Sequence, residues 1–194
     1  MKLLIPAILA LSAVGCTSSR YMRDADPTPP PGPDEAKVIV YRTAVLGGID
    51  NFPVYAVTAD RSQLVGFTET DAYFEYRGAP GKTLFIASGE GDALVEADLQ
   101  AGETYVLRVW SKFGLVSARP GLAPVEPGSV RWKEFEEARA ELQARELAPE
   151  TREAARRRTE ARAEAALAEY RSGLRTAKPL TPAHAAPPES AHGQ

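Results

Sequence analysis

The sequence is poor in the residues that most often carry catalysis or bind metals. Its 194 residues include one cysteine, Cys16, and two histidines, His184 and His192, both near the C-terminus. The rest of the chain therefore has no Ser-His-Asp triad, no Cys-His pair and no histidine to bind zinc. A lone cysteine also has no partner for a disulfide within the chain. We predict no catalytic, cofactor-binding or metal-binding residues, and no cofactor.

An apolar run long enough to cross a membrane as a helix is also missing. Residues 3–14 form the one continuous apolar stretch near the start, about a dozen residues, whereas a transmembrane helix needs roughly 20. With Lys2 before it and small residues after it, this stretch has the form of a secretory signal peptide. We therefore assign residues 1–15 to a leader that is removed on export.

Cys16 follows the run Leu-Ser-Ala-Val-Gly at residues 11–15, which resembles the lipobox of bacterial lipoproteins, although Ala13 stands where leucine is usual. The resemblance implies cleavage before Cys16, a diacylglyceryl group on its thiol and acylation of the new amino terminus. Three acyl chains would anchor the protein effectively permanently, because one chain alone binds only marginally. Thr17 replaces the usual inner-membrane retention signal, so the resemblance also implies the outer membrane, facing the periplasm. An ordinary leader cut near Ala13 is the alternative.

Neither charge sign is in large excess, since 26 acidic residues face 23 basic ones. This balance and the envelope location argue against nucleic acid as a partner. Residues 16–35 are rich in proline, which fixes the backbone and removes hydrogen-bond donors. We predict that they form the lipid anchor and an extended linker that holds the domain up to about 60 Å from the lipid.

Residues 36–127 contain short β-branched and aromatic runs punctuated by glycine, proline and aspartate, a pattern typical of strands. Candidate strands lie at residues 37–42, 53–58, 64–68, 72–76, 83–88, 93–99 and 104–110 and, more weakly, 115–118. Seven or eight short strands without a helical crossover predict a mainly β fold, an antiparallel β-sandwich.

The pattern becomes helical in residues 128–176, where Trp132, Phe135, Ala138 and Leu142 recur at intervals of three or four. Pro149 separates two predicted helices, the first ending near residue 147 and the second near residue 176. We expect these two charged α-helices to follow the sandwich. The first half of the second helix has no large apolar residue, so we expect it to stand in solvent. The proline- and alanine-rich residues 177–194 are predicted to be a disordered tail.

Several features suggest chemistry but have plainer explanations. Residues 78–83 end in Gly-Lys-Thr like a phosphate-binding loop, yet the first glycine is misplaced and a strand follows instead of a helix. Residues 89–91, Gly-Glu-Gly, could begin a dinucleotide-binding motif, but residue 94 is leucine where a third glycine is needed, so we predict a hairpin turn there. A glycosidase-type pair needs two carboxylates facing one cleft. The candidates lie at turns and at alternating strand positions, which indicates the solvated face of a sheet instead: Asp50, Asp60, Glu69, Asp71, Glu75, Glu90, Asp92, Glu96 and Asp98.

The large side chains of the strands are assigned to the core rather than to a ligand platform. They are Tyr41, Tyr55, Tyr73, Phe74, Phe85, Tyr105 and Trp110. Arg42 is less ordinary, because alternation points it toward the same side as the apolar residues before it. It is either a partly buried charge that needs a polar partner or a side chain that reaches solvent at the sheet edge.

Three short motifs occur in order within residues 36–125: Tyr-Arg at 41–42, Pro-Gly-Lys at 80–82 and Ala-Gly-Glu-Thr-Tyr at 101–105. In their order and spacing they are similar to the bacterial lipoprotein family known as domain of unknown function 2846. That resemblance implies a small β-sandwich, often behind a lipobox, with no established activity or catalytic residues. The charged helices and the tail depart from the compact family pattern.

We therefore expect a membrane-anchored, periplasm-facing lipoprotein that acts as a non-enzymatic binding or structural module of the cell envelope. Its expected partners are the membrane, through lipid on Cys16, and an envelope protein or a cell-wall polymer. Two alternatives stay open, an envelope hydrolase with a carboxylate pair and a coiled-coil oligomerisation protein. The oligomeric state is left open.

Overall fold

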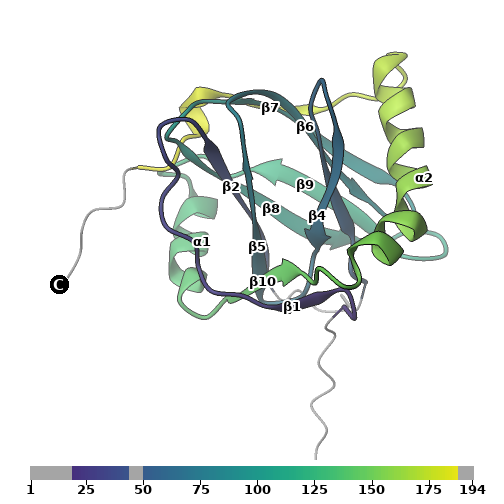
Figure 1. Cartoon of the computed structure of the whole chain (residues 1–194), viewed down its shortest axis with the longest axis horizontal. Coiled ribbons are helices and arrows are strands. Elements are labelled where there is room, and N and C mark those ends of the chain that lie inside the picture. Colours follow the sequence, from purple (N-terminus) through teal and green to yellow (C-terminus); the bar gives the residue numbers. More distant parts are fainter. Residues whose placement is uncertain (1–18, 44–49, 188–194) are drawn as a thin grey trace, which may run out of the picture.

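A computed structural model describes residues 19–43 and 50–187, which form eleven strands in two mixed sheets and two α-helices. The strands are β1 (Met22–Asp24), β2 (Ala36–Arg42), β3 (Pro53–Val57), β4 (Ser62–Phe67), β5 (Ala72–Gly78), β6 (Gly81–Ser88), β7 (Asp92–Leu99), β8 (Thr104–Lys112), β9 (Arg119–Pro124), β10 (Gln143–Leu147) and β11 (Lys178–Leu180). The helices are α1 (Val130–Arg139) and α2 (Arg152–Arg171), and a short 3-10 turn, η1 (Pro182–His184), follows β11. Figure 1 shows the sheets between the two helices, with β1 beside β10.

The mainly β class is confirmed, but the sheets are not purely antiparallel. The first sheet has the order β1-β10-β5-β2-β8-β9 and the second β11-β7-β6-β3-β4. The pairs β2–β8, β5–β10 and β7–β11 are parallel. The expectation that parallel strands need a helical crossover was wrong here, because the chain passes through the opposite sheet between β2 and β8.

The β-branched and aromatic runs form strands where the sequence predicts them, from β2 to β8. The weak candidate at residues 115–118 is not a strand. The following segment forms β9 instead, even though it begins Arg-Pro-Gly, and it pairs with β8 alone in the first sheet. A proline is tolerated there because β9 is an edge strand.

The main core lies between the two sheets, where alternate side chains of β2 and β6 point inward. Val38 and Val40 from the first sheet and Val54 and Phe85 from the second are almost completely buried. The ring of Tyr76 meets Phe85 edge to face at 5.3 Å between centroids. Each such side chain contributes about 1.5–3 kcal/mol through burial of apolar surface.

Helix α1 covers the outer face of the first sheet. Its Trp132 and Phe135 pack with Ile39, Tyr41 and Val106 in a second apolar cluster, which confirms the predicted stripe at these two positions. The helix ends at Arg139 rather than near residue 147, and the chain then forms β10 between β1 and β5. An open edge of β5 thus overrides the helical propensity of the sequence.

Helix α2 covers the outer face of the second sheet with small side chains. Ala155, Ala163 and Ala166 are buried, and the Tyr55 hydroxyl is 2.6 Å from the Thr159 hydroxyl. We expected the first half of this helix to stand in solvent, because it has no large apolar residue. That expectation was wrong, since an alanine face allows the helix to lie close against the sheet.

The segments on either side of the predicted sandwich also belong to the folded unit. Residues 25–35 do not project as an extended linker, because the Lys37 amine donates to the Thr28 carbonyl at 2.8 Å and Arg77 donates to the Pro29 carbonyl at 2.8 Å. In the predicted tail, β11 pairs with β7 and Leu180 is 1% exposed. Residues 128–176 contribute β10 as well as helices, so they complete the first sheet rather than extend from it. No helix within the described ranges is long and apolar enough to cross a membrane.

Candidate functional site

Some residues singled out in the sequence cannot be placed. Cys16 and the leader lie outside the described residues, as does His192, so lipidation at Cys16 stays a prediction. His184 lies in η1 and its ring nitrogen Nδ1 accepts a hydrogen bond from the Thr181 amide at 3.1 Å. Across residues 19–43 and 50–187, no group of three or more His, Cys, Asp or Glu side chains is arranged to hold a metal ion.

The two glycine-rich segments lie in turns between strands. β6 begins at Gly81, so Lys82 and Thr83 belong to a strand and open no helix that could cradle phosphate. Residues 89–91 connect β6 to β7, as the hairpin prediction required. Neither segment forms a nucleotide site.

Three candidate carboxylates, Glu69, Glu75 and Asp92, are withdrawn from water, and each has its own cationic partner. Glu75 lies 3.1 Å from Lys37. Glu69 is 2.7 Å from Arg145, and burial raises the pKa of Glu69. Asp92 lies 3.7 Å from Arg175 and 4.0 Å from Arg162, and burial raises the pKa of Asp92 as well. The pair of Glu69 and Arg145 therefore links β10 to the first sheet. The contact of Asp92 with Arg162 links α2 to the second sheet.

Arg42 is buried, with 3% of its surface exposed, so the prediction of a buried charge is correct and the edge position is not. Its guanidinium donates to the Asp50 carbonyl and, at 2.8 Å, to the Ser111 hydroxyl, and it lies 5.6 Å from the centre of the Phe52 ring. Burial lowers the pKa of Arg42. The side chain joins the end of β2 to the end of β8.

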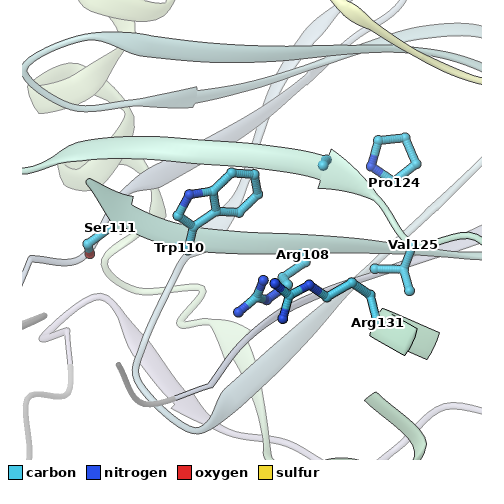
Figure 2. A pocket seen from close by; sticks show the side chains of 7 residues that line it. Arg108, Trp110, Ser111, Pro124, Val125 and Arg131 are labelled. Atoms are coloured by element: carbon cyan, nitrogen blue, oxygen red, sulfur yellow. The ribbon is translucent and has the colours of Figure 1, made fainter. Parts of the chain in front are cut away.

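The described surface has a groove of about 450 Å³ on the outer face of β8 and β9, beside α1. Along β8, Val106 lies beneath α1, and Arg108, Trp110 and Lys112 follow on the same side of the strand at intervals of two. The groove is lined by Arg108, Trp110, Ser111, Ala123, Pro124, Val125 and Arg131. In Figure 2 the side chains of Arg108 and Arg131 extend toward each other from β8 and α1.

Trp110 lies across β9 because Gly121, its partner in the sheet, has no side chain. A Cβ atom at Gly121 would be 2.1 Å from Cε2 of the indole, far closer than any carbon contact allows. The glycine thus creates the space for the ring, which forms a flat aromatic floor at the end of the groove. Figure 2 shows the indole lying over the strand pair.

Three cations surround this ring. Lys178 Nζ is 5.0 Å from the ring centre, Lys112 Nζ is 5.4 Å and the Arg108 guanidinium carbon is 5.8 Å. All are within the range of cation–π attraction, which stabilises a cation without neutralising it. Lys178 comes from β11, so both sheets contribute to the cluster.

The charge of this groove is not balanced within the described part of the chain. Arg108, Lys112 and Lys178 have no ion pair with a described carboxylate, whereas Arg131 pairs with Glu134 at 2.6 Å. Burial and the neighbouring Lys112 lower the pKa of Lys178. Since the chain as a whole has a net charge of −3, the positive cluster is a local feature. Its chemistry is that of a site for an anion that also offers an apolar or planar surface.

Sequence analysis missed this site, since it assigned Trp110 to the core. The alternation Arg108, Trp110, Lys112 was a visible signal, because residues two apart on a strand share one face. Lys178 gave no signal, since its segment was predicted to be disordered.

Comparisons with known proteins found no family model, no curated protein and no solved structure that matches the chain.

Proposed function

We propose that the chain is a lipid-anchored, non-enzymatic binding module of the bacterial cell envelope, on the periplasmic side of the outer membrane. Its partner is an envelope protein that presents an acidic segment to the groove around Trp110. The observation that carries this proposal is the set of three cations around one indole, none of them paired with a carboxylate among residues 19–43 and 50–187. A carboxylate in the groove would gain charge-assisted hydrogen bonds.

A protein partner fits the lining of the groove. Tryptophan and arginine are the residues that most often carry binding energy at protein interfaces, and here they stand next to the apolar Pro124 and Val125. An acidic peptide could lay an apolar side chain on the indole while its carboxylates reach Arg108 and Lys112. A cell-wall polymer with carboxylate or phosphate groups is the competing class of ligand, and the test below separates the two.

The envelope anchor rests on the lipobox-like run before Cys16 and on the resemblance to the domain of unknown function 2846. Both are features of the sequence, so lipidation needs its own test. Growth with an acyl-chain label should mark the natural protein and leave a Cys16→Ser variant unmarked. A variant that keeps the label would overturn the anchor at this position.

Contacts within the chain give less support to the alternatives. A hydrolase needs two carboxylates that face one cleft, whereas Glu69 and Asp92 each lie against arginines of a different element. A coiled coil needs a free apolar face on a helix. The apolar face of α1 and the alanine face of α2 both lie against the sheets.

The test is photo-crosslinking in cells that produce the full-length lipidated protein. A photoreactive residue replaces Ala123 in the groove, and the attached molecule is identified by mass spectrometry. We expect one envelope protein, with loss of the crosslink when Arg108→Glu and Lys112→Glu reverse the charge. The matched control is Lys82→Glu, because Lys82 is 72% exposed and lies on β6 in the other sheet.

A crosslink that survives the double reversal would contradict binding through these cations. A crosslink to polysaccharide instead of protein would move the proposal to the cell-wall class.

A further inference from the structure

The loop between β8 and β9 carries the most exposed apolar side chains of the described structure. Phe113 is 101% exposed, Leu115 is 90% exposed and Val116 is 95% exposed. Single exposed apolar residues are common on protein surfaces, but three large ones within four positions form a patch that favours an apolar environment.

This loop is held in one conformation by a carboxylate from the neighbouring hairpin. Glu90 accepts hydrogen bonds at 2.6 Å from the amides of Leu115, Val116 and Ser117, and Arg119 contacts the same carboxylate at 2.9 Å. Gly114 permits the tight turn, because a Cβ there would be 1.8 Å from the Ser117 carbonyl oxygen.

These hydrogen bonds to Glu90, the Glu90 clamp, lower the free-energy cost of moving the loop out of water. An unpaired backbone amide is costly to transfer out of water. With three amides satisfied by Glu90, the tip can enter an interface of low polarity at a reduced cost. With the backbone held in this way, the side chains of Phe113, Leu115 and Val116 are exposed.

The loop and the first described residue lie at the same end of the first sheet. Ser19 donates its amide hydrogen to Glu69, which lies just before β5. Ala72, the first residue of β5, pairs with Arg42, the last residue of β2. Arg42 in turn donates to Ser111 at 2.8 Å, one residue before the end of β8.

Only three peptide steps separate Ser19 from Cys16, which span at most about 10 Å when fully extended. The proline-rich residues that follow are folded against the domain and provide no extra length. A lipid on Cys16 would therefore hold this end of the sandwich at the membrane surface. Lys112 lies directly before the loop, where positive charge favours anionic headgroups.

We propose that this loop, with Phe113, Leu115 and Val116 at its tip, inserts into the interfacial layer of the bilayer in which Cys16 is anchored. The inference rests on the proposed lipid anchor. Together the acyl chains and the loop form two separate points of attachment, which fix the orientation of the domain. The groove around Trp110 then opens sideways from β8, above the lipid headgroups.

The first experiment uses the lipidated full-length protein reconstituted in vesicles of phosphatidylethanolamine and phosphatidylglycerol. Since Cys16 is the only cysteine and its thiol carries lipid, Leu115→Cys creates one site for an environment-sensitive fluorophore. We expect blue-shifted emission and quenching by a lipid-borne quencher. The control is Leu174→Cys, because Leu174 is 83% exposed and follows α2. Its label should stay in water.

The second experiment removes the lipid, so that the loop is tested without the anchor. Vesicle binding is measured for the mature chain with Cys16→Ser. The triple substitution Phe113→Ser, Leu115→Ser and Val116→Ser should reduce partitioning about tenfold or more, whereas Leu174→Ser should not change it.

The outcomes separate the two proposals. A label at position 115 that stays in water on vesicles, or a triple variant that binds as well as its parent, overturns the loop insertion while acyl labelling of Cys16 is untouched. Absence of acyl labelling overturns the anchor, and vesicle binding by the Cys16→Ser chain then decides whether the loop inserts without it. A label shielded in cells but not on vesicles overturns insertion in lipid and indicates a protein at the loop.

Discussion

At the scale of the residue, one glycine and one carboxylate determine the shape of the groove and of the β8–β9 loop. Gly121 makes room for Trp110, and the carboxylate of Glu90 organises a loop. Neither residue has a role that its type alone would suggest.

Gly121→Ala should dislodge the aromatic floor of the groove. A methyl group would overlap the indole of Trp110, so the ring must lift from β9 or the strands must separate. Because the ring is only partly buried, we expect a loss of about 1 kcal/mol in unfolding free energy, the lower end of overpacking effects. Acrylamide quenching of fluorescence should increase, since Trp132 is buried and the change reports Trp110.

The matched control for that substitution is Gly91→Ala, where the nearest side chain atom is an Arg119 carbon at 3.8 Å. It should leave both stability and quenching unchanged. Equal quenching for Gly121→Ala and the parent chain would show that the ring does not rest on the glycine.

The conformation of the β8–β9 loop should depend on pH through Glu90. The amides of Ser117, Leu115 and Val116 lower the pKa of Glu90 from 4.5 to about 2. Because the folded pKa lies below the unfolded one, the stabilisation is complete above pH 4.5 and is lost as the pH falls toward 2.

Amide chemical shifts of the three loop residues, followed by NMR, would measure this titration. The shifts should change with a midpoint near pH 2. In Glu90→Gln these amides should exchange faster with solvent at neutral pH, while amides of α1 keep their rates. A midpoint near 4.5 would show that the clamp does not form.

At the scale of the element, an ion pair fastens β10 into the first sheet. The Arg145 and Glu69 side chains are 11% and 6% exposed and lie 2.7 Å apart. Arg145→Ala would leave a buried carboxylate without its cation, so we expect a loss of about 3 kcal/mol in unfolding free energy. Denaturant titration would measure it.

Arg23→Ala is the control for that loss, because Arg23 pairs with Glu146 across β1 and β10 with side chains 51% and 48% exposed. An exposed pair is worth at most about 1 kcal/mol. Similar losses for the two variants would contradict the role assigned to the buried pair.

Local sequence pattern predicted the elements that depend on it. Strand β2 begins within one residue of its predicted range, because its apolar run fits only a strand buried on both faces. Strand β10 reads Gln-Ala-Arg-Glu-Leu, a helical composition, and becomes a strand because β5 offers an open edge. The parallel pairing of β2 with β8 and the position of Lys178 beside Trp110 depend on contacts between distant segments, which no local pattern encodes.

At the scale of the whole molecule, the folded unit is larger than the predicted sandwich of residues 36–127. In the first sheet, β1 pairs with β10 and β10 with β5, so a segment before the sandwich and one after it share one edge. In the second sheet, β11 pairs with β7, and α2 covers the outer face. The predicted linker and helical extension are therefore structural parts of one domain.

A chain that ends at Gly128 should therefore fail to fold cooperatively. It would lose α1, β10, α2 and β11, and would expose Ile39, Tyr41 and Val106 on one face and Tyr55 on the other. These elements bury apolar surface on both sheets. The free energy lost when they are removed therefore exceeds the small unfolding free energy of a domain. We expect no sharp thermal transition and binding of a hydrophobic dye, whereas a chain ending at Pro187 should unfold in one transition. A cooperative, dye-free chain ending at Gly128 would show that the sandwich is independent, and the groove would then be testable without Lys178.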